Sequence, residues 1–328
     1  MKVAQFARTF DERGLQALEN ALIQSEHGLW WRDLLGLWCP SGHPTDNHGL
    51  RLAIRNGYMN FYRRGQSVAR VSLNRKRQPI LSVHAKYVVS KAERNSVDGQ
   101  EYVTLTTTSL VRRGGQPALL YEGIETLKAW VRSIDDEYGG KEKTLVDNLL
   151  SVPANDGVID LEMGLPAWRG NAAASRMDLV SINRVRGQLT IIFGEVKCVT
   201  DSRLRCRAPV ERDKLPEVLK QLSDYRRYLA EPGHRKIVGK QYANAARLMR
   251  RLRAMADTVG PGRTLGRTIL DAANCQDLEV AELAWLIVIN EAGANQAASE
   301  IHRAKLEGEK DRVPMIVLNA PAALQFGD

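Results

Sequence analysis

Short apolar runs that alternate with helical segments place the strongest constraint on how this chain folds. In its second half, runs of strand length stand at residues 158–163, 177–182, 188–199, 283–290 and 313–319. Segments with helical periodicity precede or separate them, at residues 122–150, 215–230, 238–257 and near 296–307. Strands that alternate with helices are typical of an α/β domain. We therefore expect residues 120–328 to form an α/β domain with a mixed central sheet flanked by helices.

The first third of the chain shows a different pattern. Residues 11–38 carry apolar side chains at helical spacing, whereas residues 49–113 contain short alternating runs rich in Val, Tyr and Thr. Gly-containing breaks separate several of these runs, as in antiparallel hairpins. A Gly-Gly-x-Pro break follows at residues 114–117. We expect a smaller α+β N-terminal domain over residues 1–115, β-rich from about residue 49, that recognises a substrate or a partner.

The composition sets outer limits on the class of protein. The chain has 328 residues, of which 44% are apolar, and this is enough for the cores of two domains. Its apolar runs never approach the roughly 18 residues of a membrane span, and its N-terminus lacks the apolar core of a signal peptide. We therefore expect a cytoplasmic protein without a membrane partner. The four cysteines form no CxxC pair, and the sequence contains no P-loop, GxSxG or HExxH motif.

Positive charge is concentrated in one stretch of the chain. The formal net charge is +9, and between residues 169 and 270 Lys and Arg number 22 against 9 Asp and Glu. Such a density favours a polyanionic partner, because neutralising phosphates releases condensed counterions. Charge alone leaves a soluble basic surface, or contact with an acidic protein, as alternatives.

Two charged residues end the most apolar of the expected strands. The run TIIFGEVKCV places Glu195 and Lys197 two residues apart, so both side chains project to one face of a strand while Val196 points into the packing. A carboxylate and an ammonium group at the end of a buried strand are costly unless they are paired or used. Taken alone, the pattern is also compatible with a structural Glu–Lys pair.

The expected hairpin brings a second carboxylate to the same place. Asp178 opens the preceding strand, and a short turn around residues 185–187 joins the two strands, so pairing sets Asp178 near Glu195 and Lys197. Two carboxylates can hold a hard cation such as Mg²⁺, which lowers the pKa of a bound water. The lysine can orient that water or stabilise the transition state. We read all three residues as catalytic, and both carboxylates as ligands of Mg²⁺ or Mn²⁺.

A helix after this strand completes a known order of motifs. It carries Gln221 and Tyr225, which are four residues apart and so share one face. Asp178, a turn and the Glu195-x-Lys197 strand, followed by this Gln-x3-Tyr helix, resemble the PD-(D/E)XK nuclease superfamily, and most closely its RecB-like branch. The resemblance spans nearly half of the chain. It implies a restriction-endonuclease-like core, a divalent metal, and a supporting or DNA-binding role for Gln221 and Tyr225.

The resemblance also implies a further carboxylate from the helix before the sheet. Glu142 is the best match, and we take it as a catalytic residue and metal ligand. Asp147 on the same helix is an alternative. Asp160 and Glu162 are two further alternatives, because they share one face of the strand at residues 158–163.

Arginines close to these motifs are candidate phosphate contacts. Arg203, Arg205 and Arg207 alternate directly after the Glu-x-Lys strand, and Arg247, Arg250 and Arg251 lie on the polar side of an amphipathic helix. We expect a metal-dependent deoxyribonuclease, with RNA as an open alternative substrate, that acts in defence against foreign DNA or in DNA repair. The competing hypothesis is a non-catalytic nucleic-acid-binding or assembly subunit on a nuclease-like fold. A protein partner of the N-terminal domain and a homo-oligomer are both compatible with the sequence.

Overall fold

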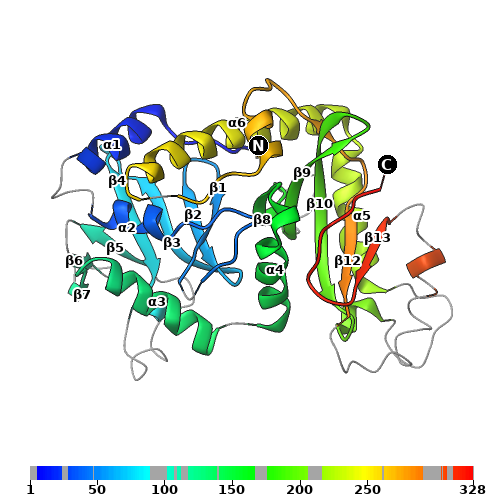
Figure 1. Ribbon diagram of the computed structural model, residues 1–328, viewed down its shortest axis with the longest axis horizontal. Coiled ribbons are helices and arrows are strands. Elements are labelled where there is room, and N and C mark those ends of the chain that lie inside the picture. The colour runs from blue at the N-terminus through cyan, green and yellow to red at the C-terminus, as the bar shows by residue number, and fades with distance from the viewer. Residues whose placement is uncertain are drawn as a thin grey trace.

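Two β-sheets lie side by side, each with its own helices, and the long helix α6 (Pro232–Asp257) runs along the top of both in Figure 1. The computed structural model describes residues 6–23, 29–46, 48–88, 102–106, 109–111, 117–138, 140–166, 176–205, 216–260, 262–290, 304, 306–308 and 313–327. The chain is therefore of the mixed α/β class that the sequence predicts.

The N-terminal sheet is an antiparallel meander of seven strands. Its spatial order follows the sequence: β1 (Arg51–Ile54), β2 (Met59–Arg63), β3 (Gln66–Leu73), β4 (Pro79–His84), β5 (Tyr102–Thr106), β6 (Ser109–Val111) and β7 (Pro117–Leu120). Alternating side chains give this sheet one apolar face. On that face α1 (Glu12–Ile23), α2 (Leu29–Leu37) and α3 (Ile124–Glu137) bury side chains such as Leu18, Trp31 and Trp130. The predicted β-rich segment is thereby confirmed.

Helix α3 packs on this N-terminal sheet. The sequence pattern had grouped residues 122–150 with the C-terminal domain, but α3 contacts β2 and β3, and its apolar side around Trp130 and Ile134 is buried with theirs. The physical reason is that β7 extends the N-terminal sheet as far as Leu120. The amphipathic helix that follows then folds back on the nearest apolar face.

The C-terminal sheet is mixed, as predicted. Its strands lie in the order β13 (Met315–Leu318), β12 (Trp285–Ile289), β10 (Gln188–Cys198), β9 (Arg176–Val185) and β8 (Val158–Gly164). The β8–β9 and β9–β10 pairs are antiparallel, whereas β12 runs parallel to β10 and β13 parallel to β12. The short β11 (Glu279–Val280) pairs with the start of β10.

Helices cover both faces of the C-terminal sheet. On one face α4 (Lys141–Ser151) packs against a cluster that contains Val196 and Ile287. On the other face Phe193 contacts Tyr225 of α5 (Glu217–Leu229) and Tyr242 of α6. The remaining elements are α7 (Arg267–Ala272) beside β9 and the short turns η1 (Ala85–Tyr87), η3 (Pro153–Asn155) and η4 (Ser202–Leu204).

The last expected helix, near residues 296–307, falls mainly outside the described residues. In the described part of the chain, no helix combines the length and the apolar character that crossing a membrane requires.

A tight turn sets the register of the β9–β10 hairpin. Arg186 and Gly187 connect the strands with φ angles of 49° and 81°. Two positive φ angles are the signature of a type I′ turn, which suits the twist of a two-residue hairpin. The pairing continues without a shift until Leu179 lies opposite Gly194. The turn therefore determines which residue of β9 reaches the end of β10.

A buried ionic cluster joins the two halves of the molecule. Asp160 of β8 accepts a hydrogen bond from Arg8 Nε at 2.9 Å and another from Tyr242 Oη of α6 at 2.9 Å, and it also pairs with Arg55 after β1. All four side chains are buried. A buried carboxylate is tolerated when it is paired and hydrogen-bonded in this way. The cluster fixes β8 relative to the N-terminal sheet.

Candidate active site

The end of β10 presents Glu195 and Lys197 to the same point. Lys197 Nζ lies 2.5 Å from Glu195 Oε1 and donates a second hydrogen bond to the carbonyl of Val196 at 2.9 Å. The Lys197 side chain is fully buried, and Val196 packs into the apolar cluster under α4. The strand alternation inferred from the sequence is therefore confirmed.

The hairpin brings Asp178 to this pair. Asp178 Oδ2 accepts a hydrogen bond from the backbone N–H of Val196 at 2.9 Å and lies 3.6 Å from Lys197 Nζ. Asp178 directly precedes Leu179, which lies opposite Gly194 in the β9–β10 pairing. Two carboxylates and one ammonium group thus converge where the sequence predicts.

The first turn of α4 adds a third carboxylate. Glu142 Oε1 lies 3.4 Å from Lys197 Nζ, and Glu142 Oε2 lies 2.6 Å from an Arg203 guanidinium nitrogen. Arg203, in η4, also pairs with Asp201 at 2.6 Å. Among the four acids considered for this role, Glu142 is the one that contacts Lys197.

The other three acids are engaged elsewhere. Asp147 faces the N-terminal part and pairs with Arg51 at 3.1 Å, and Asp160 belongs to the buried cluster described above. Glu162 adopts a φ of 50° and pairs with Lys143. Asp160 and Glu162 were expected to share one face of β8, but they contact different partners, and the backbone is left-handed at Glu162.

Lys143 is a member of the site that the sequence analysis missed. Its Nζ pairs with Glu162 and lies 3.3 Å from Asp178 Oδ1, so it bridges β8 and β9. It follows Glu142 in the first turn of α4. One feature of the sequence could have indicated it: Lys143 is the neighbour of Glu142 in the same helical turn, so its side chain can reach the same strand ends. Asp201, which orients Arg203, was missed as well.

Burial dominates the electrostatics of these carboxylates. It raises the pKa of Glu195 to about 7, with the charge of Asp178 adding to the rise and Lys197 opposing it. Burial also raises the pKa of Glu142, against the pull of Lys197. For Lys197 burial lowers the pKa, but Asp178 and Glu195 outweigh it, and the pKa lies above its ordinary value. The acidic cluster is therefore short of positive charge, although it already holds an ammonium group.

The donor set fits a hard divalent cation. Glu195 Oε2 is buried and has no hydrogen-bond partner among the described residues, and a buried oxygen of this kind is costly unless something binds it. Asp178, Glu195 and Glu142 offer carboxylate oxygens, which Mg²⁺ and Mn²⁺ accept. In the described part of the chain, no three His, Cys, Asp or Glu side chains form a ready-made metal cluster. The carboxylates are instead arranged around Lys197.

Gln221 and Tyr225 hold the strands that carry the acids. Gln221 Nε2 donates to the carbonyl of Arg176 at 2.8 Å, and Tyr225 Oη donates to the carbonyl of Met163 at 3.0 Å. The Tyr225 ring is fully buried against Phe193. Both side chains thus contact the backbone of β8 and β9 close to Asp178, as a supporting role requires.

The predicted phosphate contacts after β10 are only partly described. Arg203 reaches the carboxylates, as stated above. Arg205 has a buried Nε without a hydrogen-bond partner among the described residues. Arg207 lies outside the described residues.

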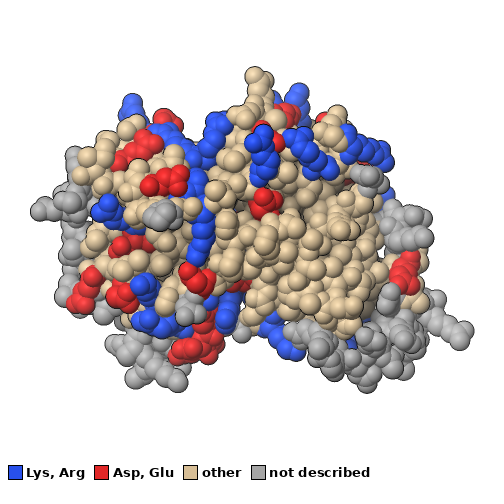
Figure 2. All heavy atoms as spheres, viewed as in Figure 1, with Lys and Arg blue, Asp and Glu red and all other residues tan. Residues whose placement is uncertain are grey.

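The arginines of α6 lie away from this site and have intramolecular partners. Figure 2 shows basic side chains along the edge where α6 runs, with acidic side chains among them. Arg247 donates to the carbonyl of Cys275 at 2.6 Å, Arg250 to Asn274 at 2.7 Å, and Arg251 to Glu19 of α1 at 2.6 Å. These contacts attach α6 to its neighbours. The predicted contact of these three arginines with phosphates stays a prediction.

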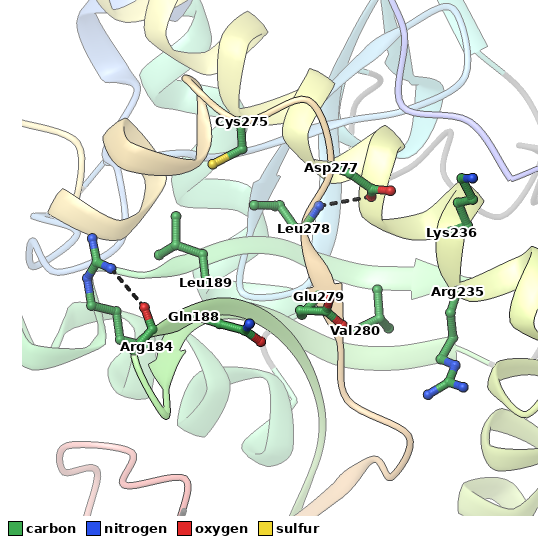
Figure 3. A pocket seen from close by; sticks show the side chains of 11 residues that line it. Arg184, Gln188, Leu189, Arg235, Lys236, Cys275, Asp277, Leu278, Glu279 and Val280 are labelled. Carbon is green, nitrogen blue, oxygen red and sulfur yellow. Dashed lines mark hydrogen bonds between the residues drawn. The ribbon is translucent and has the colours of Figure 1, made fainter.

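A cavity of about 580 Å³ lies at the opposite end of β10 (Figure 3). Leu189 and Val280 line it, beside the point where β11 pairs with Thr190 and Ile191. The strand rises about 3.3 Å per residue, so the step from Thr190 to Lys197 spans roughly 23 Å. This cavity is therefore separate from the carboxylate cluster.

No protein-family model, no curated protein and no solved structure matches this chain. A function therefore has to be argued from the site and its chemistry.

Proposed function

We propose that this chain is a metal-dependent nuclease that hydrolyses the phosphodiester bonds of DNA. The observation that carries the proposal is the convergence of Asp178, Glu195 and Glu142 around Lys197 Nζ, at 3.6, 2.5 and 3.4 Å. The order of these residues along the chain, followed by the Gln221-x3-Tyr225 helix, resembles the PD-(D/E)XK superfamily and supports the same activity.

Three carboxylates would hold the metal. Asp178, Glu195 and Glu142 are the proposed ligands, and the strongest indication of a bound ion is Glu195 Oε2, which is buried without a hydrogen-bond partner among the described residues. A bound Mg²⁺ or Mn²⁺ supplies a water of lowered pKa and neutralises charge that develops on the phosphate. The carboxylate oxygens of the cluster have lone pairs that Lys197 does not use, and a divalent cation would bind them and add the positive charge that the cluster lacks.

The basic residues act on the phosphate and on the attacking water. Lys197 keeps its ammonium group charged within the carboxylate cluster, and a buried cation of this kind can donate to a non-bridging phosphate oxygen. Arg203 is 39% exposed, so it can exchange its contact with Glu142 for a phosphate oxygen. Lys143 holds Asp178 and Glu162 in place.

The test is cleavage of plasmid and linear DNA by the purified chain in Mg²⁺, Mn²⁺ or EDTA. We expect cleavage that requires a metal and falls by at least about 100-fold in Glu195→Ala and Lys197→Ala. Glu279→Gln and Lys240→Met, both at exposed positions away from the cluster, are the matched controls and keep full activity. Binding of DNA without cutting in either metal would overturn the proposal in favour of a non-catalytic subunit.

The same assay compares substrates. A single-stranded RNA of matched sequence decides whether the activity extends to RNA. A biological setting in defence against foreign DNA or in DNA repair follows from the resemblance alone, and we propose it only on that basis.

A further inference from the structure

A groove of about 680 Å³ lies between the N-terminal sheet and the edge of the C-terminal sheet that carries Glu162 and Arg176. The N-terminal side contributes Tyr58, Arg70 and Tyr102, and the C-terminal side contributes Lys143, Glu162 and Arg176. The proposed nuclease chemistry assigns no role to the first three of these. The groove therefore calls for a ligand that spans both halves of the molecule.

The N-terminal wall of the groove is the polar face of the sheet. Pairing across the strands sets Asn60 opposite Arg70, Arg70 opposite Ser82, and Ser82 opposite Thr104, so the four form a row on one face. The neighbouring rows, which contain Phe61 and Val83, pack on the helices at the opposite face. An antiparallel sheet with one such polar face presents it to solvent or to a ligand.

Aromatic and cationic side chains are interleaved in this wall. The Arg70 guanidinium lies 3.8 Å from the centre of the Tyr58 ring, and Tyr102 is 39% exposed, which is high for so large a ring. Rings of this kind offer stacking surfaces to unpaired bases, whose faces a double helix conceals.

The charge of the groove suits a phosphate backbone. Five basic residues line it, of which Arg8 and Arg55 pair with Asp160 and Lys143 pairs with Glu162, which leaves Arg70 and Arg176. Arg70 is exposed, as is Arg176, and neither forms an ion pair with a described residue. Both guanidinium groups are therefore available to phosphate oxygens.

The groove ends beside the carboxylate cluster, to which Lys143 connects it. Lys143 lines the groove, and its Nζ lies 3.3 Å from Asp178 Oδ1. Arg176 precedes Asp178 by two residues on β9, so it is on the same strand as the first acid of the site. A strand that lies along the groove would therefore reach the neighbourhood of Asp178 at the Lys143 and Arg176 end.

We propose that this groove binds single-stranded DNA, with unpaired bases on Tyr58 and Tyr102 and the backbone on Arg70 and Arg176. The route of the strand to the carboxylates rests on the proposed nuclease function, whereas the binding itself does not. The proposed ligand is single-stranded, and the N-terminal sheet takes part in binding it.

The test measures binding in EDTA, where metal-dependent cleavage does not occur. A fluorescent single-stranded oligodeoxynucleotide and a duplex of the same sequence are titrated with the full chain, and anisotropy gives Kd at several salt concentrations. We expect tighter binding of the single strand. Tyr102→Ala and Arg70→Ala should each raise its Kd by about fivefold or more, as the loss of one stacking contact or one phosphate contact does.

Two matched variants serve as controls. Tyr102→Phe keeps the ring and should restore most of the affinity, and Arg75→Ala removes an equally exposed arginine from a turn of the same sheet and should change Kd by less than about twofold. Circular dichroism of each variant verifies the fold. The Phe variant separates loss of stacking from any loss of structure.

The outcomes separate this inference from the nuclease proposal. Equal binding of single strand and duplex, or an unchanged Kd in Tyr102→Ala, overturns the proposal that the groove binds single-stranded DNA. Metal-dependent cleavage, and with it the nuclease proposal, is independent of that result. Binding that depends on Tyr102 in a chain that cuts nothing in any metal supports the groove and removes the nuclease function.

Discussion

At the residue scale, Lys197 is what allows three carboxylates to share one buried point. Its ammonium group lies within 3.6 Å of Asp178, Glu195 and Glu142, and its side chain is fully buried. A buried charge needs partners, and removing one member of such a group leaves the others uncompensated. Lys197 is therefore required for stability as well as for the proposed chemistry, and variants at Glu195 distinguish the two roles more cleanly.

Glu195→Gln should make the metal-free protein more stable while it abolishes cleavage. In the native chain, burial and the neighbouring charge of Asp178 raise the pKa of Glu195 to about 7, so its negative charge destabilises the fold. The amide of the variant keeps a hydrogen-bond acceptor for Lys197 but carries no charge. We expect a gain of about 1 kcal/mol at pH 8, seen as a rise of a few degrees in Tm in EDTA.

Functional sites commonly carry such a stability cost. Glu279→Gln, which changes an exposed carboxylate in the same sheet, should leave Tm unchanged. A fall in the Tm of Glu195→Gln would show that the Glu195 charge stabilises the fold, and that this carboxylate is structural.

Residue spacing was enough to predict part of the site. The two-residue period of a strand placed Glu195 and Lys197 on one face, and the hairpin placed Asp178 beside them. Lys143 escaped prediction because its long side chain crosses from α4 to strand ends that only the tertiary structure brings near. Spacing along one element does not reveal contacts of this kind.

At the scale of elements, the β9–β10 turn controls the site from the far end of the hairpin. A shift of one residue in the register would move Asp178 to the other face of the sheet. Arg186 and Gly187 prevent this by adopting the two positive φ angles of a tight turn.

Gly187→Ala tests the backbone requirement of this turn. A Cβ at position 187 would meet nothing within 4 Å, so any loss of stability comes from the φ of 81° alone. We expect a loss of about 1–2 kcal/mol, seen as a lower urea midpoint with an unchanged slope. Gly233→Ala in α6 also meets nothing within 4 Å and has no positive φ, so it should be neutral or slightly stabilising. Equal losses of stability in Gly187→Ala and Gly233→Ala would show that the positive φ at Gly187 is not the cause.

The sequence predicted the elements better than their grouping. Periodicity located most strands of both sheets, although not β7 or β11, and the helical segments that contain α1 to α6, because each element repeats its apolar residues with its own period. It misassigned α3, because an amphipathic helix shows which face it buries but not against which sheet. It also missed the left-handed backbone at Glu162, and Asp160 and Glu162 contact different partners.

At the scale of the whole molecule, polar contacts join the two halves alongside the apolar core that they share. Arg251 joins α6 to Glu19 of α1, and the Asp160 cluster joins β8 to Arg8 and Arg55. The groove runs between these halves, so its width depends on the same contacts. Both proposals therefore require that the halves stay together under assay conditions.

Asp160→Asn should weaken this joint in a way that depends on pH. Burial alone would raise the pKa of Asp160, but Arg55 and Arg8 outweigh it, and the pKa lies below its ordinary value of 3.8. A carboxylate whose pKa is lowered by folding stabilises the native state above its unfolded-state pKa of about 4, and this contribution is lost as the pH falls through the folded-state pKa. At neutral pH the variant leaves two buried guanidinium groups undercompensated, which costs about 3 kcal/mol or more.

Urea unfolding at neutral pH and in steps below about pH 4 measures the difference between the native chain and Asp160→Asn. We expect the free energy of unfolding of the native chain to exceed that of the variant by a large amount at neutral pH, and by less as the native carboxylate takes up a proton. Asp271→Asn breaks two more exposed pairs, with Arg184 and Arg267, and it should cost less than about 1 kcal/mol. If the free energies of unfolding of the native chain and Asp160→Asn differ little at neutral pH, or differ more at acid pH, the cluster does not hold the halves together. The geometry of the groove would then need another source.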